Sequence, residues 1–231
     1  MTDKTLRKGR LIVIDGTDGS GKSVQTKLLV DRLLHEHYLV KMMDFPQYGK
    51  KSAGLVEEYL NGKYGSSSEV GPYKASIFYA ADRYDASFEI RKYLEKGFHV
   101  VSNRYVSSNM GHQASKISDH IEKKKFLKWL YELEYKLFEI SQPDLNLILH
   151  VPVTIARELI LKKKPREYLH GKKMDIHERD VKHLKDAEHT YLEICNMFPD
   201  FKLIECIDGQ RLLTPEETHE LVWKAVEPLL N

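Results

Sequence analysis

Short runs of apolar residues alternate along this chain with longer stretches in which apolar residues recur every three or four positions. The short runs are typical of strands buried in a parallel sheet, and the spaced pattern is typical of amphipathic helices. Five strands are predicted, at residues 11–14, 38–45, 98–102, 145–151 and 201–207. Strands that alternate with helices favour an α/β fold, in which a five-stranded parallel sheet has helices on both faces.

The helical stretches carry recognisable start and stop signals. Ser52 is predicted to cap a short helix, 65–68 is predicted to be a loop, and Pro72 suits the first turn of a long helix. In the stretch 119–140, the apolar stripe includes Leu133 and Leu137, which are therefore expected to be buried. The predicted helices are about 24–37, 53–60, 72–95, 119–140, about 154–161, about 178–197 and, after the capping signature of 214–217, the end of the chain.

The stretch between the first strand and the first helix carries the clearest chemistry. It matches G-x-x-x-x-G-K-[ST] and consists of Gly16, Thr17, Asp18, Gly19, Ser20, Gly21, Lys22 and Ser23. Its glycines let successive N–H groups turn toward phosphate oxygens at the start of a helix, where negative charge is favoured. Lys22 can then reach the β- and γ-phosphates, and the Ser23 hydroxyl can bind Mg²⁺. Strand, loop and helix in this order predict a nucleoside-triphosphate site.

Length and composition narrow the class of protein. The 231 residues, of which 42% are hydrophobic, are enough for one α/β domain spanning 1–231. A formal net charge of +2 gives no general attraction to nucleic acid or to a membrane surface. Cys195 and Cys206 lack metal-ligand spacing and are expected to be reduced core residues, which indicates a cytoplasmic protein. No apolar run approaches the length of a membrane span.

Three further groups of polar residues are candidates for the same site, because ligands bind at the carboxyl ends of parallel strands. Tyr79 and Arg83 lie four positions apart and share a helix face, although ordinary helices carry such pairs often. Arg104 directly follows the third strand, where it could bind a phosphate or form a structural ion pair. The basic stretch 162–173 could close over phosphates as a lid or remain a solvated loop.

Several of these segments together resemble thymidylate (dTMP) kinases, which belong to the P-loop nucleoside monophosphate kinases. The matching segments follow family order over nearly the whole chain: G-T-D-G-S-G-K-S, F-P-x-Y-G at 45–49, Tyr79 with Asp82-Arg83, N-R-Y-V-S-S-N at 103–109 and D-x-x-E-R-D at 175–180. The resemblance implies a three-layer P-loop kinase fold with a lid at about 162–177. It also implies a homodimer that transfers the γ-phosphoryl group of Mg·ATP to dTMP, giving dTDP and ADP.

The resemblance assigns a group of residues to the acceptor nucleotide: Asp18, Phe45, Tyr48, Tyr79, Arg83, Arg104, Asn109 and His112. Within this group, Tyr79 would stack on thymine, Arg83 would contact the edge of the base, and Arg104 would bind the acceptor phosphate. Asp18 would hold the sugar 3′-hydroxyl or a metal-bound water. His112 stands where an aromatic ring often screens the sugar 2′ position.

The chain departs from the family pattern near the phosphates. Asn103 stands where the family usually has Asp, so a negative charge near the metal is missing. Gln47 occupies a turn that often carries Arg, so one contact to the acceptor phosphate is expected to be lost. Asn109 would approach the base, and Tyr48 would line the sugar pocket.

The position after the loop aspartate is Gly19, where part of the family has Arg. A planar, bidentate donor for the transferred phosphoryl group must then come from the lid. Arg166 is the only arginine within 162–173, and Arg157 in the preceding helix is the second candidate. The predicted catalytic set is therefore Lys22, Asp18, Arg104 and Arg166.

Other activities remain open from the sequence alone. The same fold could phosphorylate another nucleoside monophosphate or a deoxynucleoside. A nucleotide-dependent switch or binding module is a second class, but the N-K-x-D run of guanine-binding switches is absent from the sequence. A nucleic-acid-binding ATPase is a third class, and the nearly neutral charge argues against it.

Overall fold

The computed structural model describes residues 8–161 and 181–230 of the chain. Its centre is a sheet of five strands in the order β2-β3-β1-β4-β5, and neighbouring strands pair in parallel throughout. The strands are β1 (Leu11–Gly16), β2 (Val40–Asp44), β3 (His99–Asn103), β4 (Leu145–His150) and β5 (Phe201–Glu205). All the predicted strands are present. Because β1 lies in the middle, the residues that follow it sit at the centre of the carboxyl edge of the sheet.

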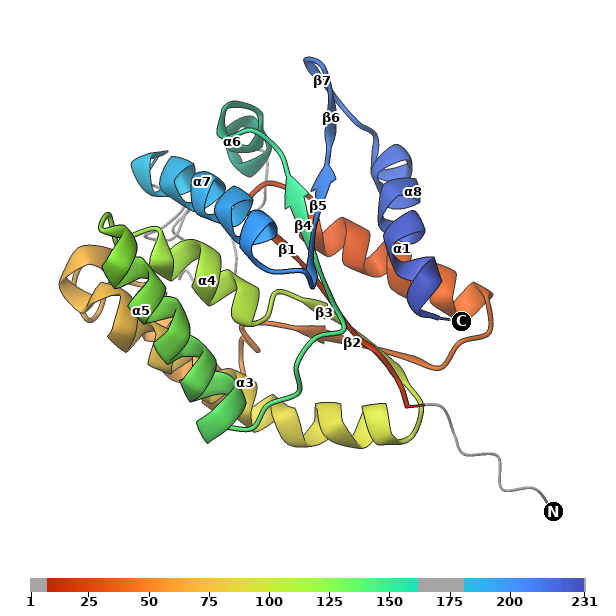
Figure 1. Ribbon diagram of the computed structural model, residues 1–231, viewed down its shortest axis with the longest axis horizontal. Coiled ribbons are helices and arrows are strands. Elements are labelled where there is room, and N and C mark those ends of the chain that lie inside the picture. The colour runs from red at the N-terminus through yellow and green to blue at the C-terminus, as the bar shows by residue number, and fades with distance from the viewer. Residues whose placement is uncertain (1–7, 162–180, 231) are drawn as a thin grey trace.

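Helices lie on both faces of this sheet (Figure 1). They are α1 (Lys22–His35), α2 (Gly54–Leu60), α3 (Ser67–Glu95), α4 (Val106–Ala114), α5 (His120–Tyr131), α6 (Val153–Leu161), α7 (Val181–Met197) and α8 (Pro215–Val226), with shorter turns η1 (Lys51–Ala53), η2 (Glu132–Leu137) and η4 (Glu227–Leu229). In the described ranges no helix has both the length and the apolar character needed to cross a membrane.

Alternation along β1 divides the apolar core into two layers. Ile12 and Ile14 face a core shared with α1 and α8, whereas Leu11 and Val13 face a second core shared with α3, α4 and α5. Figure 1 shows α1 and α8 on one side of the sheet and α3, α4 and α5 on the other. The predicted three-layer α/β fold is thus confirmed.

Two predicted helix starts are wrong. Ser52 does not cap α2, because Ala53 precedes that helix and the Ser52 hydroxyl instead donates to Asp82 at 2.7 Å. The segment predicted as a loop at 65–68 already begins α3, since Ser66 forms a capping box with Glu69. The chain then kinks at Gly71, whose φ of 75° is left-handed, and the regular helix resumes at Pro72 as predicted.

Two elements were not predicted at all. Helix α4 follows Tyr105 directly and carries Asn109 and His112. Near the end of the chain the predicted fifth strand stops at Glu205, and a short antiparallel hairpin follows, formed by β6 (Ile207–Asp208) and β7 (Arg211–Leu212). The predicted capping box of Thr214 and Glu217 at the start of α8 is confirmed.

The predicted apolar stripe of 119–140 is correct only in its first half. Phe126 and Leu130 are buried in α5, but Leu137 is 72% exposed. The reason is that η2 is a π-helix, and its wider turn rotates the following side chains away from the α-helical register. As a result Glu134, rather than Leu133 or Leu137, is fully buried on the inner face.

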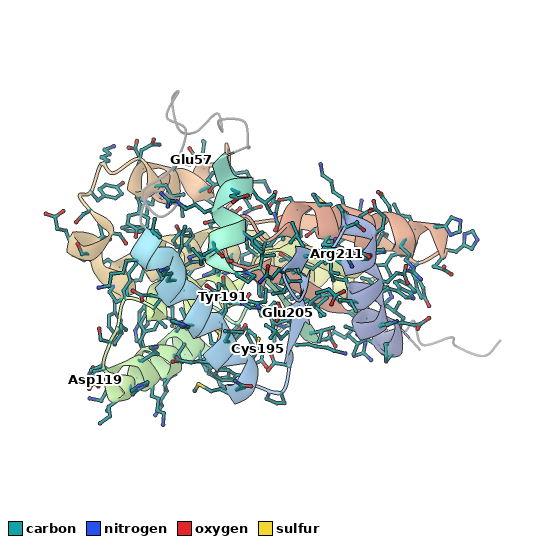
Figure 2. The ribbon with its side chains drawn as sticks, turned by 90° about the horizontal axis from the view of Figure 1, so that it is seen from above. Glu57, Asp119, Tyr191, Cys195, Glu205 and Arg211 are labelled. Carbon is teal, nitrogen blue, oxygen red and sulfur yellow. The ribbon has the colours of Figure 1, made fainter. Side chains whose placement is uncertain are left out.

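Both cysteines are free thiols. Cys206 is buried, and burial raises the pKa of its thiol to about 12. Cys195 on α7 (Figure 2) is only half-buried, and burial raises its thiol pKa to about 11. Thiols with raised pKa values are poor nucleophiles, which agrees with a structural role for both.

Candidate active site

The glycine-rich loop connects β1 to the first turn of α1, as predicted. Lys22 is 7% exposed, and its Nζ donates to the carbonyl oxygens of Gly16 at 3.0 Å and Thr17 at 2.8 Å. The Ser20 hydroxyl is buried without a partner in the described residues. The first turn of α1 contains no acidic residue. A buried cation, an unpaired hydroxyl and a free helix N-terminus together fit a bound phosphate chain.

Gly19 is required by a close approach as well as by its backbone angle. Its φ is 87°, and a Cβ placed there would lie 2.4 Å from the carbonyl oxygen of Ala156 in α6. A side chain at this position would therefore clash with the backbone that packs over the loop. In this arrangement the loop has no room for an arginine at residue 19.

A cavity of about 690 Å³ extends from this loop across the carboxyl edge of the sheet. The predicted acceptor residues all border it: Asp18, Phe45, Tyr48, Tyr79, Arg83, Arg104, Asn109 and His112. From the loop itself, 18–23 line it, whereas Gly16 and Thr17 lie behind the lining. The polar segments after β1, β2 and β3 thus share one site, as the strand-end rule predicts. Arg166 and the lid at about 162–177 lie outside the described residues.

Arg104 links the loop to the rest of the cavity. Its guanidinium forms an ion pair with Asp18 and also donates to Ser108 at 3.3 Å. Burial would lower the pKa of this guanidinium, but the carboxylates of Asp18 and Asp15 hold it well above the usual value. Its backbone is left-handed, with φ of 66°, which is uncommon for a side chain of this size. Arg104 is thus a fixed positive charge at the cavity wall.

Asp15, which the sequence did not single out, holds this region together. It is fully buried and accepts hydrogen bonds from Ser107, from Ser108 at 2.8 Å and from the hydroxyl of Tyr191 at 3.1 Å. Tyr191 comes from α7 and lies near the centre of the molecule in Figure 2. One carboxylate therefore ties β1, the first turn of α4 and α7 together beside Arg104.

Arg83 is in a structural ion pair. It is 2% exposed, and its guanidinium pairs with Glu134 from η2 and donates to the carbonyl oxygen of Tyr105 at 3.3 Å. Burial alone would lower the pKa of Arg83, but Glu134 raises it. The alternative to base contact, an ordinary helical tyrosine beside a surface arginine, is wrong for Arg83, because its side chain is buried in an ion pair. Arg83 still borders the cavity. Contact between Arg83 and a base stays a prediction.

The turn after β2 is held by Asp82. The Gln47 backbone N–H donates to Asp82 at 2.8 Å, and the Gln47 side-chain amide donates to the same residue at 3.1 Å. Gln47 is therefore part of the turn's own hydrogen bonding. Phe45 packs on Tyr105, with ring centroids 5.7 Å apart, and Tyr48 remains exposed at the cavity mouth.

His112 forms part of the wall beside Arg104, and His183 on α7 contacts it. The Nε2 atom of His112 lies 3.4 Å from Arg104, and its Nδ1 lies 3.4 Å from Nε2 of His183. A guanidinium can only donate, so His112 Nε2 accepts and Nδ1 carries the proton. Burial, followed by the charge of Arg104, lowers the pKa of His112 well below its usual value. His112 is therefore a neutral ring whose tautomer is set by its neighbours.

The residues near Ser23 fit a magnesium ion that keeps most of its water. Asn103 donates through Nδ2 to Ser23 Oγ at 3.2 Å and to Asp44 Oδ1 at 2.8 Å, and its own Oδ1 is buried without a partner among the described residues. No group of three potential metal ligands occurs within the described ranges. Mg²⁺ in nucleotide sites needs only one or two protein oxygens besides phosphates and water. Asp44, which the sequence analysis did not identify, supplies a carboxylate next to Asn103, whose amide donates to it.

Two further residues missed by the sequence analysis are on or next to α4. Gln113 borders the cavity. The Nζ atom of Lys116 donates to the side-chain oxygen of Gln113 at 2.6 Å. Gln113 lies four positions after Asn109, so both project from one face of a helix. That spacing was a usable signal, but it carries information only once 106–114 is known to be helical.

Comparisons with known proteins agree with this geometry. The family model described as thymidylate kinase matches residues 14–206. A probable thymidylate kinase from Thermococcus kodakarensis is 28% identical over 95% of this chain and 98% of its own length. The thymidylate kinase of Plasmodium falciparum is 31% identical over 68% of each chain. A solved structure of the Candida albicans thymidylate kinase superposes with a TM-score of 0.74 at 24% identity, covering 96% of this chain and 93% of the other.

The family model covers most of the chain, including the loop, Arg104, α4 and the strand that ends at Glu205. The Candida albicans structure independently supports the same fold. These matches run through the segments that line the cavity. The chain belongs to the thymidylate kinase family.

Proposed function

We propose that this chain transfers the γ-phosphoryl group of ATP, bound with Mg²⁺, to dTMP, giving dTDP and ADP. Family membership supplies the reaction class, phosphoryl transfer to a nucleotide. One observation supports an acceptor base that presents N–H beside a carbonyl, as thymine does, over cytosine: two side-chain amides on α4, Asn109 and Gln113, border the cavity in orientations that their neighbours fix.

The orientation of each amide follows from what its neighbour can do. The Ser76 carbonyl oxygen can only accept, so the Asn109 atom that lies 3.2 Å from it is the nitrogen. The Lys116 ammonium can only donate, so the Gln113 atom 2.6 Å from it is the oxygen. Asn109 therefore keeps its oxygen, an acceptor, for the cavity. Gln113 keeps its NH₂ group, a donor.

An acceptor beside a donor complements the edge of thymine. Thymine presents an N3–H donor next to a carbonyl acceptor, whereas cytosine presents an acceptor at N3 next to an amino donor. Cytosine would therefore meet Asn109 and Gln113 with like groups facing each other. Tyr79, half-buried in the same cavity wall, provides an aromatic ring for stacking.

The chain's charged side chains would perform the transfer by positioning and charge stabilisation. Lys22 would leave its carbonyl partners for the β- and γ-phosphates, and Arg104 would hold the acceptor phosphate. Asp18, already paired with Arg104, would orient that arginine and accept from the sugar 3′-hydroxyl or a water. Ser23, with Asp44 and Asn103 behind it, would hold Mg²⁺, which supplies charge neutralisation for the phosphate oxygens.

We propose Arg166 as the donor that stabilises the transferred group, because Gly19 cannot supply one. Arg166→Ala should lower kcat by about 10³ while ATP and dTMP still bind, and lysine should rescue poorly because it lacks the planar fork. Arg157→Ala is the matched control, since Arg157 is exposed on α6. If only Arg157→Ala loses kcat, Arg157 is the residue that stabilises the transferred phosphoryl group. If both variants keep a normal kcat, the proposal that an arginine of the lid stabilises this group is refuted.

We also propose that 1–231 form one domain with a lid at about 162–177, that two copies form a homodimer, and that the protein is cytoplasmic. The dimer is supported by exposed apolar side chains on α3 and beside it, including Tyr84, Phe88 and Leu137. Sedimentation of the purified chain at several concentrations tests it, and a monomer at all concentrations would refute it.

An assay of ADP release with a panel of acceptors tests the proposed reaction. ATP is offered with dTMP, dUMP, dCMP, dGMP or thymidine, and the reaction without acceptor is the control. dTMP should be preferred over dUMP by about 10–200-fold, the range that one methyl group in an apolar pocket can supply. Equal rates for dTMP, dCMP and dGMP would discard dTMP as the specific acceptor. A thymidine rate above that of dTMP would favour a deoxynucleoside kinase.

A further inference from the structure

Lys116 lies just beyond α4, behind the wall formed by Gln113. Its Nζ donates to Gln113 Oε1 at 2.6 Å and to the hydroxyl of Tyr59 at 2.9 Å. Tyr59 comes from α2, is fully buried and packs edge-on against Tyr79, with ring centroids 6.3 Å apart. Lys116 does not border the cavity. Lys116 therefore contacts Gln113, which borders the cavity, and Tyr59, which packs against Tyr79 of the cavity wall.

The Gln113 carboxamide would otherwise be free to turn. Gln113 is 1% exposed, and within the described ranges its amide has no hydrogen-bond partner except Lys116. A carboxamide rotated by 180° has almost the same shape but exchanges its donor and its acceptor. Only the ammonium of Lys116 makes the two orientations unequal, because facing it with NH₂ would oppose donor to donor.

We propose that Lys116 is a positioning residue for base selectivity: it holds the Gln113 carboxamide with its NH₂ group toward the cavity, so that a base with a carbonyl there is preferred over one with an amino group. This inference rests on the proposed function, in which the acceptor base occupies the cavity beside Gln113. The predicted preference is for thymine and uracil over cytosine.

The charge state of Lys116 gives the arrangement a pH dependence. Burial lowers the pKa of Lys116 to about 7. Among the described residues, the titratable group that is hydrogen-bonded to Lys116 is the phenol of Tyr59 on α2, while its partner on α4, Gln113, does not titrate. Below this pKa the ammonium can only donate. Above it the neutral amine has a lone pair and can accept from NH₂, so the orientation of Gln113 is less strictly set.

The experiment compares kcat/KM for dTMP and dCMP in three variants. Lys116→Met keeps an unbranched side chain one atom shorter and removes the donor, and Lys116→Arg keeps a donor that cannot accept. Lys125→Met is the matched control, because Lys125 is an exposed lysine whose ion pair with Glu122 lies on the surface of α5. The dTMP/dCMP ratio is also followed in the wild-type chain between pH 6 and 8.5. Both substrates carry the same phosphate, so its ionisation cancels in the ratio.

Lys116→Met should lower the dTMP/dCMP ratio roughly tenfold, the effect of one mismatched hydrogen bond. The loss should appear in KM, with kcat for dTMP nearly unchanged. Lys116→Arg should restore the ratio, and Lys125→Met should leave it at the wild-type value. The wild-type ratio should fall as the pH rises through about 7.

A ratio in Lys116→Met within twofold of wild type would overturn the proposal. If that variant does not fold, a wild-type ratio that stays constant across the pH range would overturn it equally. Failure of the proposed function looks different, because it appears in the wild-type chain even at pH 6.5: dTMP is then not phosphorylated, or is no better an acceptor than dCMP.

Discussion

The two ends of the cavity are built in different ways. The phosphate end is one continuous stretch, 16–23, and Lys22 bonds to carbonyls only five and six residues away. The acceptor end is assembled from distant parts of the chain: Arg83 pairs with Glu134 51 residues on, and Tyr191 reaches Asp15 across 176 residues. Function at the first end depends on local backbone geometry, and function at the second depends on tertiary packing. Mutations at the two ends should therefore fail in different ways.

The acceptor end should fail through stability. Glu134→Gln leaves Arg83 buried without a counter-charge, which should lower the free energy of unfolding by about 3–5 kcal/mol. Urea unfolding followed by circular dichroism measures this change. Glu132→Gln is the control, because Glu132 lies on the same turn and its contact with Lys128 is exposed. If Glu134→Gln were as stable as Glu132→Gln, the buried pair would not organise this end.

The phosphate end should fail in the chemical step alone. Lys22→Ala should lower kcat by about 10²–10³ with little change in stability, because a preorganised charge contact of this kind contributes about 3–4 kcal/mol to the transition state. Steady-state kinetics and a thermal melt measure both quantities. Lys27→Ala, an exposed lysine on the same helix, should behave as wild type. Turnover of Lys22→Ala within a few-fold of wild type would show that the triphosphate does not sit on this loop.

Between the two ends of the cavity, Asp44 should contribute to binding of the divalent metal ion. Asp44→Asn should weaken Mn²⁺ binding to the ADP complex by about 10–100-fold, the usual effect of losing an outer partner of a metal site. Electron paramagnetic resonance of free Mn²⁺ gives the dissociation constant without requiring turnover. Asp31→Asn, which removes an exposed carboxylate from α1, is the control for general charge. An unchanged dissociation constant in Asp44→Asn would remove Asp44 from the metal's surroundings.

The same difference decides what could be predicted from the sequence. The loop, the five strands and the capping box at Thr214 depend on local patterns, and all were predicted correctly. Helix α4 was missed because its sequence, VSSNMGHQA, has too few apolar residues for a helical period. Its Gly111 is explained only by α7, since a Cβ there would lie 2.3 Å from the ring of Tyr191.

The π-helix at 132–137 escaped prediction for a related reason. The α-helical spacing of the apolar residues predicted that Leu137 is buried, and it did not indicate that Glu134 is buried. In the structure the wide π-helical turn places Glu134 against Arg83. The ion pair between these two residues therefore forms where the chain leaves the α-helical spacing. With α4 and this turn missing, the sequence could name Asn109 and Arg83 as candidates but not the partners that fix their orientation.

The most direct test is the transfer of labelled phosphoryl from ATP to dTMP and to dCMP by the wild-type chain. The acceptor of Asn109 and the donor of Gln113 match one base and oppose the other. The account therefore predicts labelled dTDP, with kcat/KM for dTMP at least about 10²-fold above that for dCMP at pH 6.5. Equal values of kcat/KM for the two acceptors, or no labelled dTDP, would contradict it.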